Sequence, residues 1–149
     1  MKIVSSAKSQ TSKIAKELAK KILKLKINSR AVVVGLSGEL GSGKTAFCQS
    51  FAKALGVKEK VHSPTFVIFK KYELRIKNYE HLYHFDAYRI KNKKDIVALG
   101  WKKIISDPKN IILVEWADNV RKIFPKKHFW INLAHLGKNK RGIDIKSVK

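Results

Sequence analysis

One stretch of this sequence has the residue types and spacing needed to hold a phosphate chain. Residues 38–45 are Gly-Glu-Leu-Gly-Ser-Gly-Lys-Thr, which is the pattern G-x-x-x-x-G-K-T. Glycines let the backbone take positive φ angles and wrap closely round phosphates, whose oxygens then face backbone N–H groups. Lys44 would supply a mobile charge for the β- and γ-phosphates, and Thr45 a hydroxyl for Mg²⁺. The stretch therefore predicts a P-loop that binds a nucleotide.

The flanking sequence provides the strand and the helix that such a loop requires. Residues 31–36 form a short apolar run of the kind buried in parallel sheets. Residues 46–55 place Phe47, Phe51 and Leu55 on one side of a helix that Gly56 ends. An amphipathic helix is also predicted before the loop, over residues 11–25, where apolar side chains recur every three or four residues.

The rest of the chain favours a mixed sheet with short helices. We expect strands near residues 66–72, 80–86 and 111–114, a polar turn over 74–79, and a final hairpin of 128–136 with 143–148. Short helices are expected over 95–105, with a break at Gly100, and over 120–124. Residues 1–149 are therefore predicted to form one α/β domain. Its fold would be three-layered and P-loop NTPase-like, with a mixed sheet of parallel centre and antiparallel edge strands.

Two carboxylates follow predicted strands, where a P-loop needs an acidic partner for Mg²⁺. Glu115 comes directly after a fully apolar strand and is the better candidate, because the carboxyl end of a buried strand lies beside such a loop. Asp86, at the end of a half-apolar strand, is the second. One could serve the metal and the other the attacking water. The alternative is that both are ordinary surface carboxylates at strand ends.

Other residues carry weaker predictions. Ser63 and Thr65, on either side of Pro64, fit a switch segment and an ordinary turn equally well. Trp116 could stack on an exposed group or pack in the core. Cys48 is expected to be buried in the helix after the loop. The histidines show no metal-ligand spacing with acids or with Cys48, so we expect them to be structural or surface residues.

The charge of the chain points to a polyanionic partner without identifying one. A formal net charge of +22 suggests contact with RNA. The excess is nearly all lysine, however, and lysines spread evenly over a surface can reflect a general lysine bias. Both explanations remain open. No apolar run approaches the roughly 20 residues of a membrane span, and the first residues lack the core of a signal peptide. We therefore expect a cytoplasmic protein with no membrane association.

Five blocks together resemble the TsaE (YjeE) family of bacterial P-loop ATPases, and the resemblance extends over essentially the whole chain. The blocks in family order are residues 38–45, Ser63-Pro64-Thr65-Phe66, His84-Phe85-Asp86-Ala87-Tyr88-Arg89, Leu99-Gly100 and Val114-Glu115-Trp116. Ala87 stands where the family usually has leucine, and Ala117 where proline is common. Neither departure touches the expected chemistry.

The resemblance implies an accessory ATPase, slow when alone, that uses ATP and Mg²⁺. The family assists the enzymes that install threonylcarbamoyl on the adenosine beside the anticodon of certain tRNAs, and the implied partner is a TsaB–TsaD-type complex. The implied catalytic residues are Lys44, Asp86 and Glu115, and the implied metal ligands are Thr45 and Glu115. The implied nucleotide-binding residues are Glu39, Leu40, Gly41, Ser42, Gly43, Lys44 and Thr45, with Thr11 and, in the turn of the last hairpin, Arg141. Ser63, Thr65 and Trp116 match the switch-like segment and the Glu-Trp pair.

Two other functions compete with this one. A small-molecule P-loop kinase would need a substrate pocket and a lid with arginines, but arginines are scarce and no insertion of lid length is evident. A basic RNA-binding module with a vestigial P-loop would be expected to carry interleaved aromatic and basic motifs, which the sequence lacks. ATP turnover would exclude the RNA-binding module, and phosphate transfer to a metabolite would identify a kinase.

Overall fold

The computed structural model describes residues 2–26, 29–39, 41–61 and 68–148. The helices of this part are α1 (Lys8–Leu23), α2 (Lys44–Ala54), α3 (Lys93–Val97), α4 (Trp101–Ser106) and the 3₁₀ helix η1 (Ala117–Ile123). The strands are β1 (Lys2–Ser5), β2 (Val32–Gly38), β3 (Phe69–Ile76), β4 (Tyr79–Asp86), β5 (Asn110–Glu115), β6 (His128–Gly137) and β7 (Lys140–Val148).

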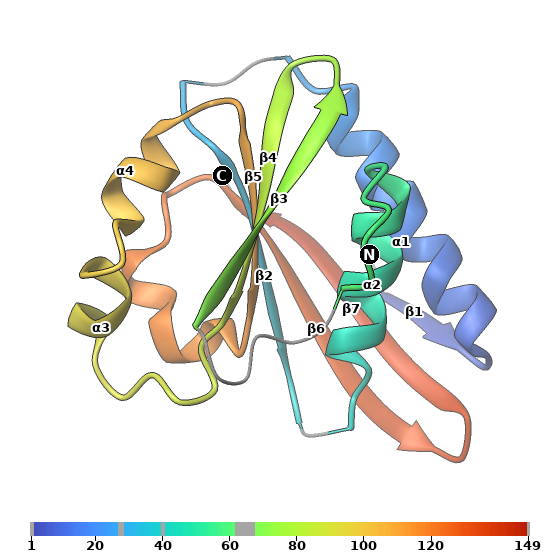
Figure 1. Cartoon of the computed structure of the whole chain (residues 1–149). Coiled ribbons are helices and arrows are strands. Elements are labelled where there is room, and N and C mark those ends of the chain that lie inside the picture. The colour runs from blue at the N-terminus through green and yellow to red at the C-terminus, as the bar shows by residue number, and fades with distance from the viewer. Residues whose placement is uncertain (1, 27–28, 40, 62–67, 149) are drawn as a thin grey trace.

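The strands form a single sheet in the order β1-β7-β6-β2-β5-β4-β3. Its middle is parallel, because β2 pairs in parallel with both β5 and β6, and β4 pairs in parallel with β5. Its edges are antiparallel, with β3 beside β4 at one end and β7 and β1 beyond β6 at the other. Figure 1 shows α1 and α2 covering one face and α3 and α4 covering the other. The predicted three-layer fold with a parallel centre and antiparallel edges is confirmed.

Each face of the sheet has its own apolar core, because successive side chains of a strand point to opposite faces. Val34 and Leu113 pack in the core under α1 and α2. Val33 and Val114 pack in the core under α3, α4 and η1. By the same alternation Glu115, two residues after Leu113, faces α2. The carboxyl end of β5 thus presents its carboxylate to the helix that follows the glycine loop.

Two predicted boundaries were wrong, and one strand was not predicted. The turn expected over residues 74–79 is short, because β3 continues to Ile76 and β4 begins at Tyr79. Tyr72 and Leu74 are buried, whereas Glu73 and Arg75, which alternate with them along this edge strand, are exposed. The helix before the loop begins at Lys8 rather than at residue 11, and strand β1 was not predicted at all. A four-residue strand is too short to show alternation in sequence.

Candidate active site

The glycine loop joins the carboxyl end of β2 to the start of α2, at the lower end of the molecule in Figure 1. Gly38 has φ 153°, and a Cβ there would lie 2.3 Å from the carbonyl oxygen of Leu133. Gly43 caps α2 in the left-handed region, at φ 100°. These two positions exclude larger residues for different reasons, a close backbone approach and a positive φ. Of the predicted loop residues, Glu39 is exposed and Leu40 lies outside the described residues.

Lys44 lies against this loop and is buried. Its Nζ donates hydrogen bonds to the carbonyl oxygens of Gly38 at 2.6 Å and Glu39 at 2.8 Å. It also donates to Ser42 Oγ at 3.3 Å. The same Nζ lies 3.9 Å from the centre of the Trp116 ring, within the range of a cation–π contact. Burial lowers the pKa of Lys44, while the negative charge of Glu115 opposes that shift.

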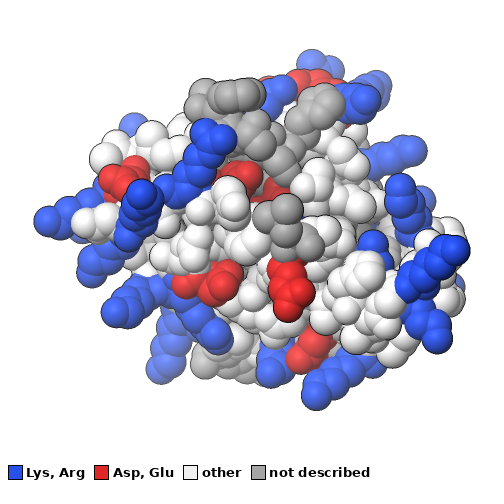
Figure 2. Space-filling model, turned by 90° about the horizontal axis from the view of Figure 1, so that it is seen from below, with Lys and Arg blue, Asp and Glu red and all other residues white. Residues whose placement is uncertain are grey.

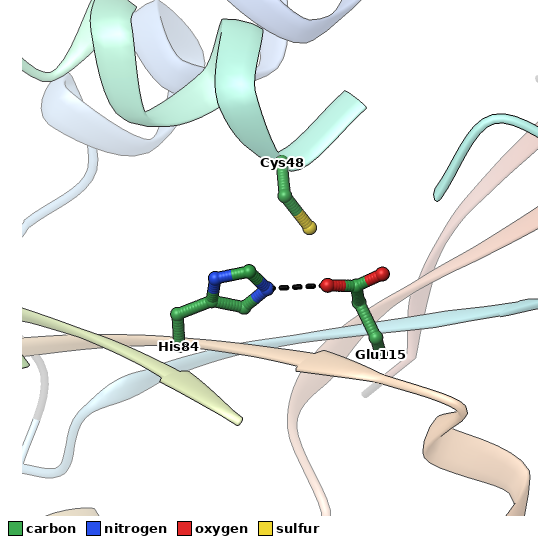
Figure 3. Close-up of side chains that lie close together, drawn as sticks. All are labelled: Cys48, His84 and Glu115. Atoms are coloured by element: carbon green, nitrogen blue, oxygen red, sulfur yellow. Dashed lines mark hydrogen bonds and ion pairs between the residues drawn. The ribbon is translucent and has the colours of Figure 1, made fainter. Parts of the chain in front are cut away.

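Glu115 is the centre of the site and is nearly inaccessible to solvent, at 2% exposure. Thr45 Oγ1 donates to its Oε1 at 3.1 Å. His84 Nε2 lies 2.6 Å from its other oxygen, Oε2 (Figure 3). A threonine hydroxyl and a carboxylate are hard oxygen ligands of the kind that Mg²⁺ prefers. The predicted pair of metal ligands therefore lies together at the first turn of α2, and its chemistry fits Mg²⁺.

Asp86 ends β4 directly opposite Glu115 in the strand register. The backbone N–H of Tyr88 donates to its Oδ1 at 3.0 Å. Burial raises the pKa of Asp86, and the nearby charge of Glu115 raises it further, against the lowering effect of the Tyr88 hydrogen bond. The two predicted carboxylates are thus neighbours, but only Glu115 is linked to Thr45 by a hydrogen bond in the described structure.

Trp116 follows Glu115 with a backbone that is unusual for a large side chain, at φ 57°. Its ring packs against Tyr88, with 4.8 Å between the ring centres, as well as over Lys44. Tyr88 itself is 54% exposed. Trp116 is partly buried and also packs against the core under α3, α4 and η1, so its ring combines core packing with contacts to Lys44 and Tyr88.

A pocket of about 680 Å³ opens beside the loop, between the starts of α1 and α2 and the β6–β7 turn. Thr11, Gly43 and Arg141 all line it, so residues far apart in sequence meet here. Thr11 Oγ1 is hydrogen-bonded to Ser5 Oγ at 2.9 Å. Arg141 was predicted in the hairpin turn, but it lies in β7 opposite His135, because the turn is only Lys138-Asn139. The pocket could take the part of a nucleotide that lies beyond its phosphates.

Sequence reasoning missed His84. The histidines were expected to be structural or surface residues, and His84 is fully buried, but its contact with the carboxylate of Glu115 was not predicted. Cys48, buried as predicted, comes from α2, and one ligand atom from each of Cys48, His84 and Glu115 lies within 4.8 Å of the others (Figure 3). The predicted switch residues Ser63 and Thr65 lie outside the described residues.

Figure 2 views the molecule from below the orientation of Figure 1, at the end where β2 leads into α2. Lysine and arginine side chains stand mostly around the outline of this face, and acidic side chains lie nearer its middle. The basic groups therefore do not form one patch over the coloured part of this face. No helix among the described residues is both long and apolar enough to cross a membrane.

A parallel sheet centre, a glycine loop from β2 to α2 and a carboxylate at the end of the neighbouring β5 define a P-loop NTPase-like protein. The sequence matches the family model for the threonylcarbamoyl adenosine biosynthesis protein TsaE over residues 5–143. The chain therefore belongs to the TsaE family of tRNA threonylcarbamoyladenosine biosynthesis, as the resemblance predicted.

Individual relatives agree with the family match. The tRNA threonylcarbamoyladenosine biosynthesis protein TsaE of Rickettsia felis is 34% identical over 140 residues, covering 93% of this chain and 75% of that protein. The Bacillus subtilis protein of the same name is 34% identical over 116 residues, covering 78% of this chain and 70% of that protein. Among solved structures, Bacillus YdiB aligns with a TM-score of 0.75 at 29% identity, over all of this chain and 86% of that one.

Proposed function

We propose that this protein binds and hydrolyses Mg-ATP as an accessory ATPase of tRNA threonylcarbamoyladenosine biosynthesis, working with a TsaB–TsaD-type complex. The observation that carries the proposal is the meeting of Lys44, Thr45 and Glu115 at one end of the sheet. These three residues supply the cation, the hydroxyl and the carboxylate that hydrolysis of a nucleoside triphosphate on a P-loop requires. Family membership supports the pathway, and the site chemistry supports the activity.

Each residue would have a distinct task. Thr45 and Glu115 would hold Mg²⁺, which when bound neutralises charge on the β- and γ-phosphates. Lys44 would exchange its contacts with the loop carbonyls for contacts with phosphate oxygens, since Nζ already lies among the loop's polar atoms. Asp86 would orient the attacking water and accept its proton, and the raised pKa of its carboxyl group makes it a better base than an exposed aspartate.

The nucleotide beyond the phosphates would lie in the pocket between α1 and α2. Arg141 offers a cationic side chain at the rim of this pocket, and Gly43 connects the pocket to the glycine loop. The ring of Trp116, whose centre lies 3.9 Å from Lys44 Nζ, would cover this lysine and keep water away from its charge. In this proposal, Arg141 would bind the nucleotide and Trp116 would cover Lys44 in the same site.

Phosphate release from ATP by the pure protein tests this proposal. We expect slow release that requires Mg²⁺, stops in EDTA and is lost in Lys44→Ala. Release that continues unchanged in Lys44→Ala would refute it. A kinase would instead transfer the γ-phosphate to an added metabolite, which labelled ATP would reveal as a phosphorylated product rather than inorganic phosphate.

The partner and the location remain parts of the proposal. Binding to a TsaB–TsaD pair, measured with and without ATP, would test the proposed partner.

A cytoplasmic site of action is expected because tRNA and its modifying enzymes are found there. Direct contact with tRNA would be electrostatic for a chain of net charge +22, so it should weaken steeply as salt is raised.

A further inference from the structure

His84 and Glu115 form a buried pair that the proposed hydrolysis does not itself explain. His84 has no exposed surface and Glu115 has 2%, and they lie on adjacent parallel strands. The register places His84 opposite Leu113 and Asp86 opposite Glu115, so His84 is one step diagonal from Glu115 on the face toward α2. An ionised carboxylate buried this deeply needs hydrogen-bond donors, because desolvation otherwise disfavours its charge.

The contact between them is a hydrogen bond rather than a metal bridge. Cys48, His84 and Glu115 offer the nitrogen, sulfur and oxygen ligands of a zinc site. However, ligand atoms about 2.0–2.2 Å from a tetrahedral zinc lie more than about 3 Å from each other. The 2.6 Å between His84 Nε2 and Glu115 Oε2 leaves no room for an ion between them and is a short, charge-assisted hydrogen bond.

The donor in this bond is the Nε2–H of His84. A carboxylate can only accept, so the proton must be on Nε2. The other ring nitrogen, Nδ1, is buried and has no hydrogen-bond partner among the described residues. A bare Nδ1 tolerates that position better than an N–H would, because a buried donor without an acceptor is costly. The surroundings of the ring therefore favour the tautomer that donates to Glu115.

We propose that His84 is a positioning residue for the metal-binding carboxylate: it holds Oε2 of Glu115 so that Oε1 faces Thr45. This inference rests on the proposed function, in which Thr45 and Glu115 hold Mg²⁺. It also explains the spacing of His84 and Asp86 on β4. His84 and Asp86 are two residues apart and so share one face of β4. His84 holds Glu115, and Asp86 lies opposite it in the strand register.

The test measures ADP affinity by calorimetry at increasing Mg²⁺ and in EDTA. His84→Phe keeps the ring and removes the donor, whereas His84→Gln keeps an N–H near the position of Nε2. Loss of such an outer hydrogen bond typically weakens metal binding by about 10–100-fold. We expect the phenylalanine variant to need at least about tenfold more Mg²⁺ to reach half of the maximal increase in ADP affinity. Its affinity in EDTA should stay within about twofold of the parent, with partial recovery in the glutamine variant.

Two controls make the result specific. Cys48→Ser alters an equally buried neighbour and should leave the Mg²⁺ requirement unchanged. If thermal unfolding shows that His84→Phe does not fold, His84→Asn replaces it, because its amide lies near the position of Nδ1 and cannot reach Glu115 in the same way. The asparagine variant should then need more Mg²⁺ than the glutamine variant.

Some results would overturn the inference. A Mg²⁺ requirement equal to that of the parent in the folded variants without the donor would exclude a positioning role. Equal loss of ADP affinity with and without Mg²⁺ would show a purely structural role. If the parent itself bound ADP identically in Mg²⁺ and EDTA, the failure would lie in the metal assignment of Thr45 and Glu115, not in His84 alone.

Discussion

Replacing Glu115 should affect stability and metal binding to different extents, depending on the substitute. In Glu115→Ala the buried N–H of His84 loses its acceptor, which stands 2.6 Å away in the parent. An unsatisfied buried donor costs about 1–3 kcal/mol, and breaking a buried pair costs about 3–5 kcal/mol. We therefore expect the free energy of unfolding of the ligand-free protein to fall by about 2–4 kcal/mol.

Glu115→Gln is the matched variant. Its carbonyl oxygen can still accept from His84, and its amide can face the Thr45 hydroxyl, which is able to accept as well as donate. We expect its stability to stay within about 1 kcal/mol of the parent. Urea unfolding without nucleotide measures both costs. Mg²⁺-dependent ADP binding should be lost in both variants, and hydrolysis should fall at least about a hundredfold.

The two substitutions could refute the account in separate ways. An alanine variant as stable as the parent would show that His84 does not depend on this carboxylate. A glutamine variant that kept the Mg²⁺ dependence of ADP binding would remove Glu115 from the metal ligands.

Three further predictions follow from the same geometry. Lys44→Ala should weaken ATP binding at least about a hundredfold in calorimetry. The variant should still fold, because burial lowers the pKa of Lys44 and its charge therefore does not stabilise the folded state. Near-parental ATP affinity would exclude its role. Asp86→Asn should abolish hydrolysis and stabilise the ligand-free protein at pH 7. Because folding raises the pKa of Asp86, its ionised form destabilises the folded state, so the stability gained by Asp86→Asn should shrink as pH falls towards about 4. Urea unfolding that showed the same gain in unfolding free energy at every pH would contradict this. Arg141→Ala should weaken ATP binding about tenfold without lowering the melting temperature, whereas Arg75→Ala, exposed on the far edge strand β3, should do neither; equal effects would remove Arg141 from the site.

The fold was predictable because its strongest signals are local. Two fully apolar strands, the glycine motif between strand and helix, and the helical spacing after it fix the centre of the sheet. The edges were less predictable. The polar residues Arg75, Lys77 and Asn78 make residues 74–79 resemble a turn in sequence, whereas in the structure β3 continues to Ile76, with Arg75 exposed on this edge strand.

The meeting of Thr45 and Glu115 was predictable for the same reason, since Thr45 is the last residue of the motif and Glu115 ends an apolar strand. The role of His84 was not. Alternation alone could have placed His84 and Asp86 on one face of β4, but the register of β4 against β5 decides which of them reaches Glu115. That register depends on pairing between two strands whose contacting residues, His84 and Glu115, are 31 residues apart in the sequence. No local sequence pattern encodes such a pairing.

ATP hydrolysis by the pure protein, with and without a TsaB–TsaD pair from the same source, tests the central claim most directly. We expect slow, Mg²⁺-dependent turnover that is absent in Lys44→Ala and changes when the pair is added. Turnover that ignores the pair, together with transfer of the γ-phosphate to a small metabolite, would contradict the account and identify a kinase.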